Sequence, residues 1–298
     1  MSSASRQTVL IIGATGRVDA AVLAALHALP EPDRPHIRAL VRSPDAVTAT
    51  INPIDIVKGD LRDVEGLKSA IKGINTIFLM TGDSRDQIEL ECSVIDAARA
   101  VGRPRVVKLS AITAGLPGRP SFGAFHGEIE DELLTSGLPF TILRPTMFFQ
   151  SLELFAGRVK SSNRLIVPAG QGAVAMIDIA DVAAVAAAVI TQPGHEGKTY
   201  MLTGSTAPTM ADVAIALSKA VGRTIAYTSP PLPIARLMMR FAEGMDWWLS
   251  GQVTDLFAAI RKGAEAEVSG DVQMLVGHPQ TRLETYLSQR LDFWLGRH

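Results

Sequence analysis

Aliphatic residues run directly into a glycine turn at Val9-Leu10-Ile11-Ile12-Gly13-Ala14-Thr15-Gly16. The aliphatic part is short and continuous, which is typical of a buried strand, and apolar residues recur at helical spacing through 18–29. A strand, a Gly-x-x-Gly turn and a helix in this order are the context in which a dinucleotide-binding fingerprint is meaningful. Gly13 would permit the tight turn, Gly16 would let the backbone approach a pyrophosphate, and the helix would offer free N–H groups. We therefore expect a nucleotide site here, the alternative being a turn that binds nothing.

The alternation of strand and helix continues through the first half of the chain. Further strands are predicted at 36–41, 54–58, 75–80, 105–109 and 140–143, and helices at 63–72, 84–101 and 124–136. Strands separated by crossovers of helix length predict an α/β fold with a doubly wound parallel sheet. Such sheets bind ligands at the carboxyl ends of their strands.

The pattern changes after Arg144-Pro145. Residues 146–174 are predicted to be mainly loops, 178–191 a helix and 198–203 a late strand of the sheet. Beyond residue 207, helices are predicted at 209–220, 231–243, 246–262 and 281–295. We therefore assign 1–150 to a nucleotide-binding domain whose sheet is completed by 175–206, and 151–298 to a smaller, mostly helical lobe that covers the substrate.

The composition excludes several classes of protein. The 298 residues carry 29 Lys and Arg against 30 Asp and Glu, a net charge of −1, and 47% of them are hydrophobic. A disordered chain would be less apolar, a nucleic-acid-binding surface would need clustered basic residues, and no apolar run is long enough to span a membrane. The single cysteine, Cys92, cannot form an internal disulfide, and no Cys/His spacing suggests a metal site. We expect a cytoplasmic protein, monomeric or homodimeric, with a small-molecule ligand and no metal, nucleic acid or membrane partner.

An acidic residue interrupts the glycine pattern. The third glycine of the fingerprint would stand at position 19, where this chain has Asp19. Repulsion between its carboxylate and a pyrophosphate about 5 Å away would cost roughly 3 kcal/mol, or about 100-fold in affinity, at an effective dielectric constant of about 20. Arg17 would offset part of this cost. Replacing Asp19 by glycine is therefore expected to strengthen cofactor binding.

Residues that suit a dinucleotide follow four successive strands. The cofactor-binding residues predicted in this first part of the chain are Gly13, Thr15, Gly16, Arg17, Val18, Arg42, Asp60, Leu61, Thr81 and Gly82. Arg42 follows the second strand, where arginine suits the 2′-phosphate of NADP and an acid would suit NAD. Asp60 follows the third strand, where the adenine would lie, and Thr81-Gly82 follow the fourth, where the nicotinamide-side ribose would pass. The alternatives are a surface role for Arg42 and a helix N-cap for Asp60 or Asp63.

Five stretches of the chain carry a family resemblance: 9–16, 106–111, 136–145, 177–183 and 197–204. Through them the chain resembles the NmrA-like family of atypical short-chain dehydrogenases/reductases. The resemblance implies a Rossmann-type domain that prefers NADP(H) over NAD(H), with the substrate held under the helical lobe. The subgroup that it most resembles includes NADPH-dependent quinone and dye reductases, and the family also includes non-enzymatic nucleotide sensors. Asp19 stands where the family has glycine, which lowers the expected cofactor affinity.

The helix after the fifth strand lacks the usual catalytic pair of short-chain dehydrogenases. It has neither the Tyr nor the Lys of Tyr-x-x-x-Lys, and the three tyrosines of the chain lie elsewhere. His126 and Glu130 are expected to share one face of that helix, so that the carboxylate raises the pKa of the imidazole and lets it donate a proton. Ser110, at the end of the fifth strand, is expected to bond a substrate oxygen or the nicotinamide. The alternatives are a helix-terminal histidine beside a solvated Glu130, and a serine that satisfies a backbone group.

Two further segments are candidates for the substrate side. Residues 115–123 are rich in glycine and proline and suit a lid over the site. The resemblance places Pro145 and either Phe148 or Phe149 beside the nicotinamide. One of the two phenylalanines is expected in the core, because neighbouring side chains of an extended chain point in opposite directions.

These features predict an NADPH-dependent oxidoreductase that reduces a small conjugated or aromatic, quinone-like compound by hydride transfer. Two alternatives remain open. One is a non-catalytic NADP(H)-binding redox sensor, and the other is a cofactor-free isomerase or cyclase in which Asp19 has removed cofactor binding.

Overall fold

The computed structural model describes residues 6–13, 16–43 and 54–297 of the chain. The chain forms two compact units, each assembled from segments that lie far apart in the sequence. The sheet unit consists of Met1–Ala111, Phe125–Arg144 and Ile179–Tyr200, and the helical unit of Ile112–Ala124, Pro145–Asp178 and Met201–His298. The chain therefore passes between the units five times.

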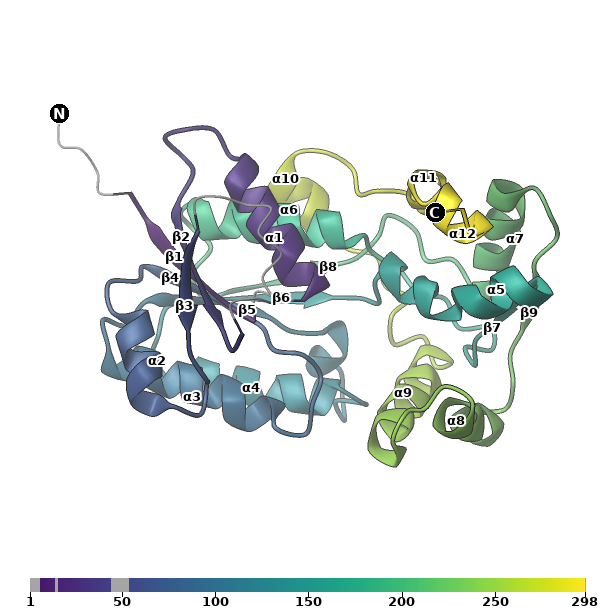
Figure 1. Ribbon diagram of the computed structural model, residues 1–298, viewed down its shortest axis with the longest axis horizontal. Coiled ribbons are helices and arrows are strands. Elements are labelled where there is room, and N and C mark those ends of the chain that lie inside the picture. The colour runs from purple at the N-terminus through teal and green to yellow at the C-terminus, as the bar shows by residue number, and fades with distance from the viewer. Residues whose placement is uncertain (1–5, 14–15, 44–53, 298) are drawn as a thin grey trace. The chain divides into compact units, whose positions relative to one another are not determined.

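A seven-stranded sheet in the order β3-β2-β1-β4-β5-β6-β8 forms the centre of the sheet unit (Figure 1). The strands are β1 (Thr8–Ile12), β2 (His36–Val41), β3 (Asp55–Lys58), β4 (Thr76–Leu79), β5 (Arg105–Leu109), β6 (Phe140–Pro145) and β8 (Lys198–Leu202). Neighbouring strands from β3 across to β6 pair in parallel. The predicted α/β fold with a doubly wound parallel sheet and a mostly helical C-terminal part is confirmed. The strand order reverses between β1 and β4, which is where such sheets bind ligands.

Helices cover both faces of the sheet (Figure 1). Helices α1 (Arg17–Ala28) and α6 (Ile179–Thr191) lie on one face, and α2 (Val64–Ile71), α3 (Gln87–Ala100) and α4 (Gly123–Thr135) lie on the other. Helix α1 buries Val18, Val22 and Leu26, which recur every four residues along one face. Helix α6 is rich in alanine and largely buried, so α1 packs closely against it.

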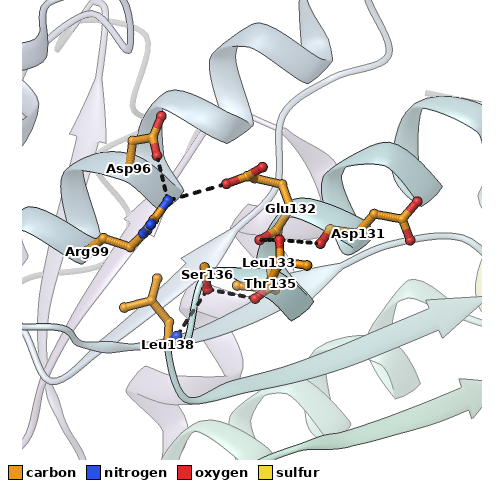
Figure 2. Close-up of polar contacts among 8 residues, drawn as sticks. All are labelled: Asp96, Arg99, Asp131, Glu132, Leu133, Thr135, Ser136 and Leu138. Carbon is orange, nitrogen blue, oxygen red and sulfur yellow. Dashed lines mark hydrogen bonds and ion pairs between the residues drawn. The ribbon is translucent and has the colours of Figure 1, made fainter.

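An arginine joins the two helices on the second face. Arg99 of α3 lies 3.4 Å from a carboxylate oxygen of Asp96 on its own helix and 3.6 Å from one of Glu132 on α4 (Figure 2). The three side chains are partly exposed, so these ion pairs contribute about 0–1 kcal/mol each and mainly set which surfaces of the helices meet.

The end of α4 is shaped by a serine. Ser136 Oγ donates to the carbonyl oxygen of Leu133 at 2.6 Å and accepts from the N–H of Leu138 at 3.0 Å (Figure 2). Gly137 between them has a φ of 71°, a conformation that glycine adopts without strain. The chain turns here from α4 into β6.

The helical unit has a hydrophobic core of its own, in which Phe149 stacks on Tyr286. Its elements are η2 (Ile112–Gly115), η3 (Phe149–Phe155), α5 (Ala156–Ser162), α7 (Met210–Val221), α8 (Leu232–Phe241), α9 (Trp247–Ile260), α10 (Asp271–Val276), α11 (Leu283–Gln289), α12 (Leu291–Leu295) and the parallel strands β7 (Arg164–Ile166) and β9 (Ala226–Thr228). Two predictions are wrong here. Residues 146–174 contain helices and a strand because their apolar side chains enter this core, and 281–295 is two helices separated at Arg290.

In the described part of the chain, we find no helix that combines the length and the apolar character needed to cross a membrane.

Candidate functional site

A cavity of about 610 Å³ lies where four strands of the sheet unit end. Ile12, Val41, Gly59 and Met80, at or just after the carboxyl ends of β1, β2, β3 and β4, line it. Seven of the predicted cofactor-binding residues also line it: Gly13, Gly16, Arg42, Asp60, Leu61, Thr81 and Gly82. The volume falls within the range of about 300–1,000 Å³ that is usual for ligand sites. The structure thus brings the predicted strand-end residues together in one cavity.

The glycine turn is shaped by its contact with the end of β4. Gly13 has a φ of +82°, and a β-carbon built on it would lie 2.8 Å from the carbonyl oxygen of Met80. Only glycine fits this position without displacing the β4 backbone. Gly16 is the N-cap of α1, and since glycine has no side chain, no side-chain oxygen caps the first turn of the helix. The predicted tight turn at Gly13 is therefore confirmed.

Four predicted cofactor-binding residues in the described part of the chain do not line this cavity, and a fifth cannot be compared with it. Thr15 lies outside the described residues. Arg17 is exposed on α1, and Val18 is buried in the core beneath that helix. Pro145 and Phe148 belong to the helical unit. That unit has a smaller cavity of about 380 Å³ between α7 and α11, which none of the predicted site residues lines.

Asp19 is the residue whose predicted effect the structure changes most. Only 2% of Asp19 is exposed, and its Oδ1 has no hydrogen-bond partner among the described residues. Burial raises the pKa of Asp19 to about 8, although hydrogen bonds from the backbone N–H groups of Asp19 and Gly16 oppose the rise. The carboxyl is therefore mostly protonated at neutral pH. The predicted charge repulsion is wrong at that pH, because burial keeps the group uncharged.

Two carboxylates after β3 have different roles. Asp63 caps α2, since its Oδ1 accepts a hydrogen bond from the N–H of Gly66 at 3.1 Å. Asp60 Oδ1 accepts from the N–H of Arg62 at 2.9 Å and lies on the cavity wall. The capping role that the sequence left open thus belongs to Asp63, and Asp60 stays at the cavity.

A buried ion pair lies behind the cavity wall at Thr81. Lys108 of β5 and Glu91 of α3 are both completely buried, with Nζ 2.7 Å from Oε2. Glu91 Oε1 accepts hydrogen bonds from the backbone N–H of Thr81 at 3.1 Å and from its hydroxyl at 3.0 Å. Lys108 Nζ also donates to the carbonyl oxygen of Leu109 at 2.5 Å and lies 3.2 Å from Nδ1 of His126. The pair therefore connects the cavity wall with His126 on α4.

Lys108 and Glu91 were missed by the sequence reasoning, although a signal was present. Lys108 stands between Val107 and Leu109 in the predicted strand 105–109, and a parallel sheet of this fold class is covered by helices on both faces. A buried ammonium group requires an anionic partner. The sequence pattern does not say which of the acids on neighbouring helices would supply it.

His126 and Glu130 do not form the predicted pair. Glu130 instead accepts hydrogen bonds from Ser110 Oγ and from Arg144 Nη2, each at 2.5 Å. His126 faces Lys108, and burial together with this ammonium group holds the pKa of the imidazole well below its usual value. The predicted rise in the pKa of His126 is therefore wrong, since burial disfavours the imidazolium and the nearest charge is positive. The alternative of a solvated Glu130 is also wrong, because this side chain is buried.

The predicted lid, residues 115–123, belongs to the helical unit and is attached to α9. Ser121 Oγ donates to the carbonyl oxygen of Gln252 at 2.6 Å. Phe122 meets Trp248 edge to face, with 6.4 Å between the ring centroids. These contacts hold the segment against α9; its function as a lid stays a prediction.

The strand order, the cavity at its reversal and the glycine turn define a Rossmann-type α/β protein. The family within this class is given by the NmrA-like family model, which matches residues 5–273. The chain belongs to the NmrA-like family, as the resemblance in its sequence indicated.

Several similar proteins have names that describe redox enzymes. NAD(P)H azoreductase of Xenophilus azovorans is 31% identical over 274 residues, which cover 91% of this chain and 93% of that protein. Quinone oxidoreductase 2 of Escherichia coli strain K12 is 30% identical over 285 residues, which cover 94% of this chain and 97% of that protein. The crystal structure of an Escherichia coli NADPH-dependent quinone oxidoreductase complexed with NADPH has a TM-score of 0.86 at 28% identity, covering 94% of this chain and 99% of that one.

Proposed function

We propose that this protein is an NAD(P)H-dependent oxidoreductase that uses NADPH to reduce a small conjugated or aromatic, quinone-like compound. The observation that carries the proposal is that one cavity at the strand ends collects seven predicted cofactor-binding residues. The azoreductase and quinone oxidoreductase relatives support the class of reaction and of substrate. The relative crystallised with NADPH supports the choice of cofactor.

The cavity suits a dinucleotide in its shape and its chemistry. Gly13 leaves no room for a side chain and Gly82 has open space around it, so the backbone is approachable at the ends of both β1 and β4. The N-terminus of α1 offers partial positive charge to a diphosphate. Asp60 would accept from the adenine amino group, and Arg42 would pair with the 2′-phosphate that distinguishes NADP(H) from NAD(H). The bound nicotinamide supplies the hydride.

Three buried polar residues are assigned roles in hydrogen bonding to the substrate and in orienting the groups of the site. We assign His126 as the group whose neutral ring donates a hydrogen bond to the reduced substrate oxygen. The hydroxyl hydrogen of Ser110 is used by Glu130, so Ser110 offers its lone pairs and acts as an acceptor, as the carboxamide of a nicotinamide would require. Glu130 is held by Arg144 and orients the Ser110 hydroxyl, so its role is positioning rather than acid catalysis.

Titration with four nucleotides and an oxidation assay test the proposal together. NADPH, NADP+, NADH and NAD+ are titrated separately into the protein, and NADPH consumption is then followed with a panel of quinones, enones and azo dyes. We expect NADPH to bind more tightly than NADH and to be consumed with at least one class of acceptor. Binding without any turnover would favour the redox sensor instead, and no binding at millimolar nucleotide would favour the cofactor-free alternative. Either outcome refutes the proposal.

An arginine variant tests the cofactor preference directly. Loss of a charge-assisted contact of about 1.5–3 kcal/mol corresponds to a loss of affinity of about 10- to 100-fold. Arg42→Ala should therefore weaken NADPH binding by about that factor and leave NADH binding unchanged. Arg99→Ala, which removes a partly exposed arginine of α3 that does not line the cavity, is the matched control. An equal loss for both nucleotides in Arg42→Ala would contradict the assigned 2′-phosphate contact.

A further inference from the structure

Lys108 lies inside a buried polar cluster formed by β5, α3 and α4. Three groups surround its Nζ: Glu91 Oε2 at 2.7 Å as an ion-pair partner, the carbonyl oxygen of Leu109 at 2.5 Å and His126 Nδ1 at 3.2 Å. Glu91 Oε2 is the ion-pair partner and accepts no hydrogen bond from the described residues, so the ammonium hydrogens are directed to the carbonyl oxygen and to Nδ1. Gln87 Nε2 and Thr81 donate to the other carboxylate oxygen of Glu91, which holds this ion pair in place.

The chemistry of the Lys108–His126 contact determines where the imidazole carries its proton. An ammonium group has no lone pair and can only donate, so Nδ1 of His126 must accept with its lone pair. The proton of the neutral ring then lies on Nε2. A doubly protonated ring has no lone pair on Nδ1 and would place a second positive charge 3.2 Å from Nζ. We propose that Lys108 is a positioning residue that holds His126 neutral, with its proton on Nε2.

The charges around the ring agree with this assignment. Burial and the charge of Lys108 both lower the pKa of His126. Glu91 on α3 and Asp83 on the segment after β4 interact with Lys108, but neither is a source of the shift at His126. Glu130, on the same helix as His126, makes its hydrogen bonds to Ser110 and Arg144. The charged group that contacts the ring is therefore a cation.

A fixed Nε2–H has a use in the proposed reaction, and only this use depends on the proposed function. A neutral imidazole donates a hydrogen bond from Nε2 at every pH above its lowered pKa. It therefore stabilises negative charge that develops on a substrate oxygen without first having to become charged. The hydrogen-bond strength stays constant across the physiological pH range, which an ordinary histidine does not achieve.

Nitrogen NMR of the histidine side chains tests the inference without any turnover. The chain has six histidines, and the signals lost in His126→Gln identify those of His126. In the wild-type protein we expect an unprotonated Nδ1 and a protonated Nε2, with no change between about pH 5 and pH 8. In Lys108→Met we expect the His126 signals to titrate within this range or to show the other tautomer.

Further variants separate positioning from folding. Lys108→Met leaves Glu91 buried without its cation, so Lys108→Met/Glu91→Gln, which removes both charges, is measured beside it. Lys108→Arg keeps a cationic donor and should restore the wild-type signals. Lys68→Met, which removes a partly exposed lysine of α2, is the matched control. A proton on Nδ1 in the wild-type protein, or wild-type signals in both Lys108→Met and Lys108→Met/Glu91→Gln, would overturn the inference.

The pH dependence of turnover provides the second measurement. With NADPH and a quinone, kcat should vary little between about pH 5 and pH 8 in the wild-type protein, and should fall or become dependent on pH in the double variant, because Lys108 no longer fixes the proton on Nε2. If the NMR signals are as expected but the protein reduces no acceptor, the proposed function is refuted and the inference on Lys108 stands. If the wild-type enzyme is active but carries the proton of His126 on Nδ1, the inference on Lys108 is refuted and the proposed function stands.

Discussion

Asp19→Asn should stabilise the protein by an amount that grows with pH. Asparagine keeps the shape of the side chain and cannot ionise. The carboxyl of Asp19 has a pKa of about 8 in the folded protein against 3.8 without the fold. Below pH 3.8 it is protonated in both states. Between these two values the folded state holds one proton more than the unfolded state, so the stability of the wild-type protein falls as the pH rises.

The size of this effect follows from the same two pKa values. Each pH unit between them costs about 1.4 kcal/mol, so the wild-type protein loses about 4 kcal/mol by pH 7 relative to a neutral side chain. Urea denaturation of both proteins at pH 5, 6, 7 and 8 measures the difference at each pH. Other groups that titrate in this range are common to both proteins and cancel. A difference that stays constant from pH 5 to pH 8 would refute the burial of a protonated Asp19.

Cofactor affinity gives an independent measurement of the same group. An ionised Asp19 about 5 Å from a diphosphate costs roughly 3 kcal/mol, and at pH 9 about nine-tenths of the group is ionised in the free protein. NADPH binding to the wild-type protein should therefore weaken about 10-fold between pH 7 and pH 9. The Asp19→Asn variant, titrated under the same conditions, should lack this loss and serves as the control for ionisation of the nucleotide itself. Equal pH dependence in both proteins would show that the carboxyl does not face the bound cofactor.

Three further predictions concern other parts of the molecule. Burial raises the pKa of Glu265 from 4.5 to about 7, so Glu265→Gln should stabilise the protein increasingly between pH 4.5 and 7, by about 3 kcal/mol at the upper end. A difference in the free energy of unfolding that does not change between pH 5 and pH 8 would contradict this. A β-carbon on Gly123 would lie 2.6 Å from the carbonyl group of Thr113, so Gly123→Ala should destabilise by about 1–3 kcal/mol, whereas Gly157→Ala, with open space around it, should be neutral or stabilising in the same thermal unfolding assay. Burial raises the pKa of Cys92 from 9.0 to about 11, so its alkylation at neutral pH should be about 100-fold slower in the folded than in the unfolded protein; equal rates would refute the shift.

The sheet and its cavity were predictable because both follow from local patterns. A continuous aliphatic run identifies each strand, and the residue that follows it lies at the carboxyl edge of the sheet. Arg42, Asp60 and Thr81 were therefore predicted correctly to lie near one another, before any pairing between distant segments was known. The strand order that places them together was a property of the fold class.

The chemistry of the buried groups was not predictable in the same way. Spacing of four residues places His126 and Glu130 on one face of α4, but their partners come from other elements. Lys108 on β5 contacts the first, and Ser110 and Arg144 contact the second. Protonation follows from such contacts and from burial, neither of which the local sequence determines.

The helical unit was harder to predict for a physical reason of its own. The boundary between α11 and α12 lies where packing requires it and not at a helix-breaking residue. Arg290 separates α11 from α12, and no glycine or proline marks this position. Arg290 instead makes an ion pair with Glu153 at 2.8 Å, a partner 137 residues away in the sequence.

The five passages of the chain between the two units limit how the protein can be divided. A fragment that ends at residue 150 would lack α6 and β8, and α1 would lose the helix against which it packs. A single proteolytic cut cannot release either unit as one continuous polypeptide. Exchange of one whole unit between two relatives would likewise require replacement of three separate segments at once. The helical unit therefore cannot be transferred as one continuous module.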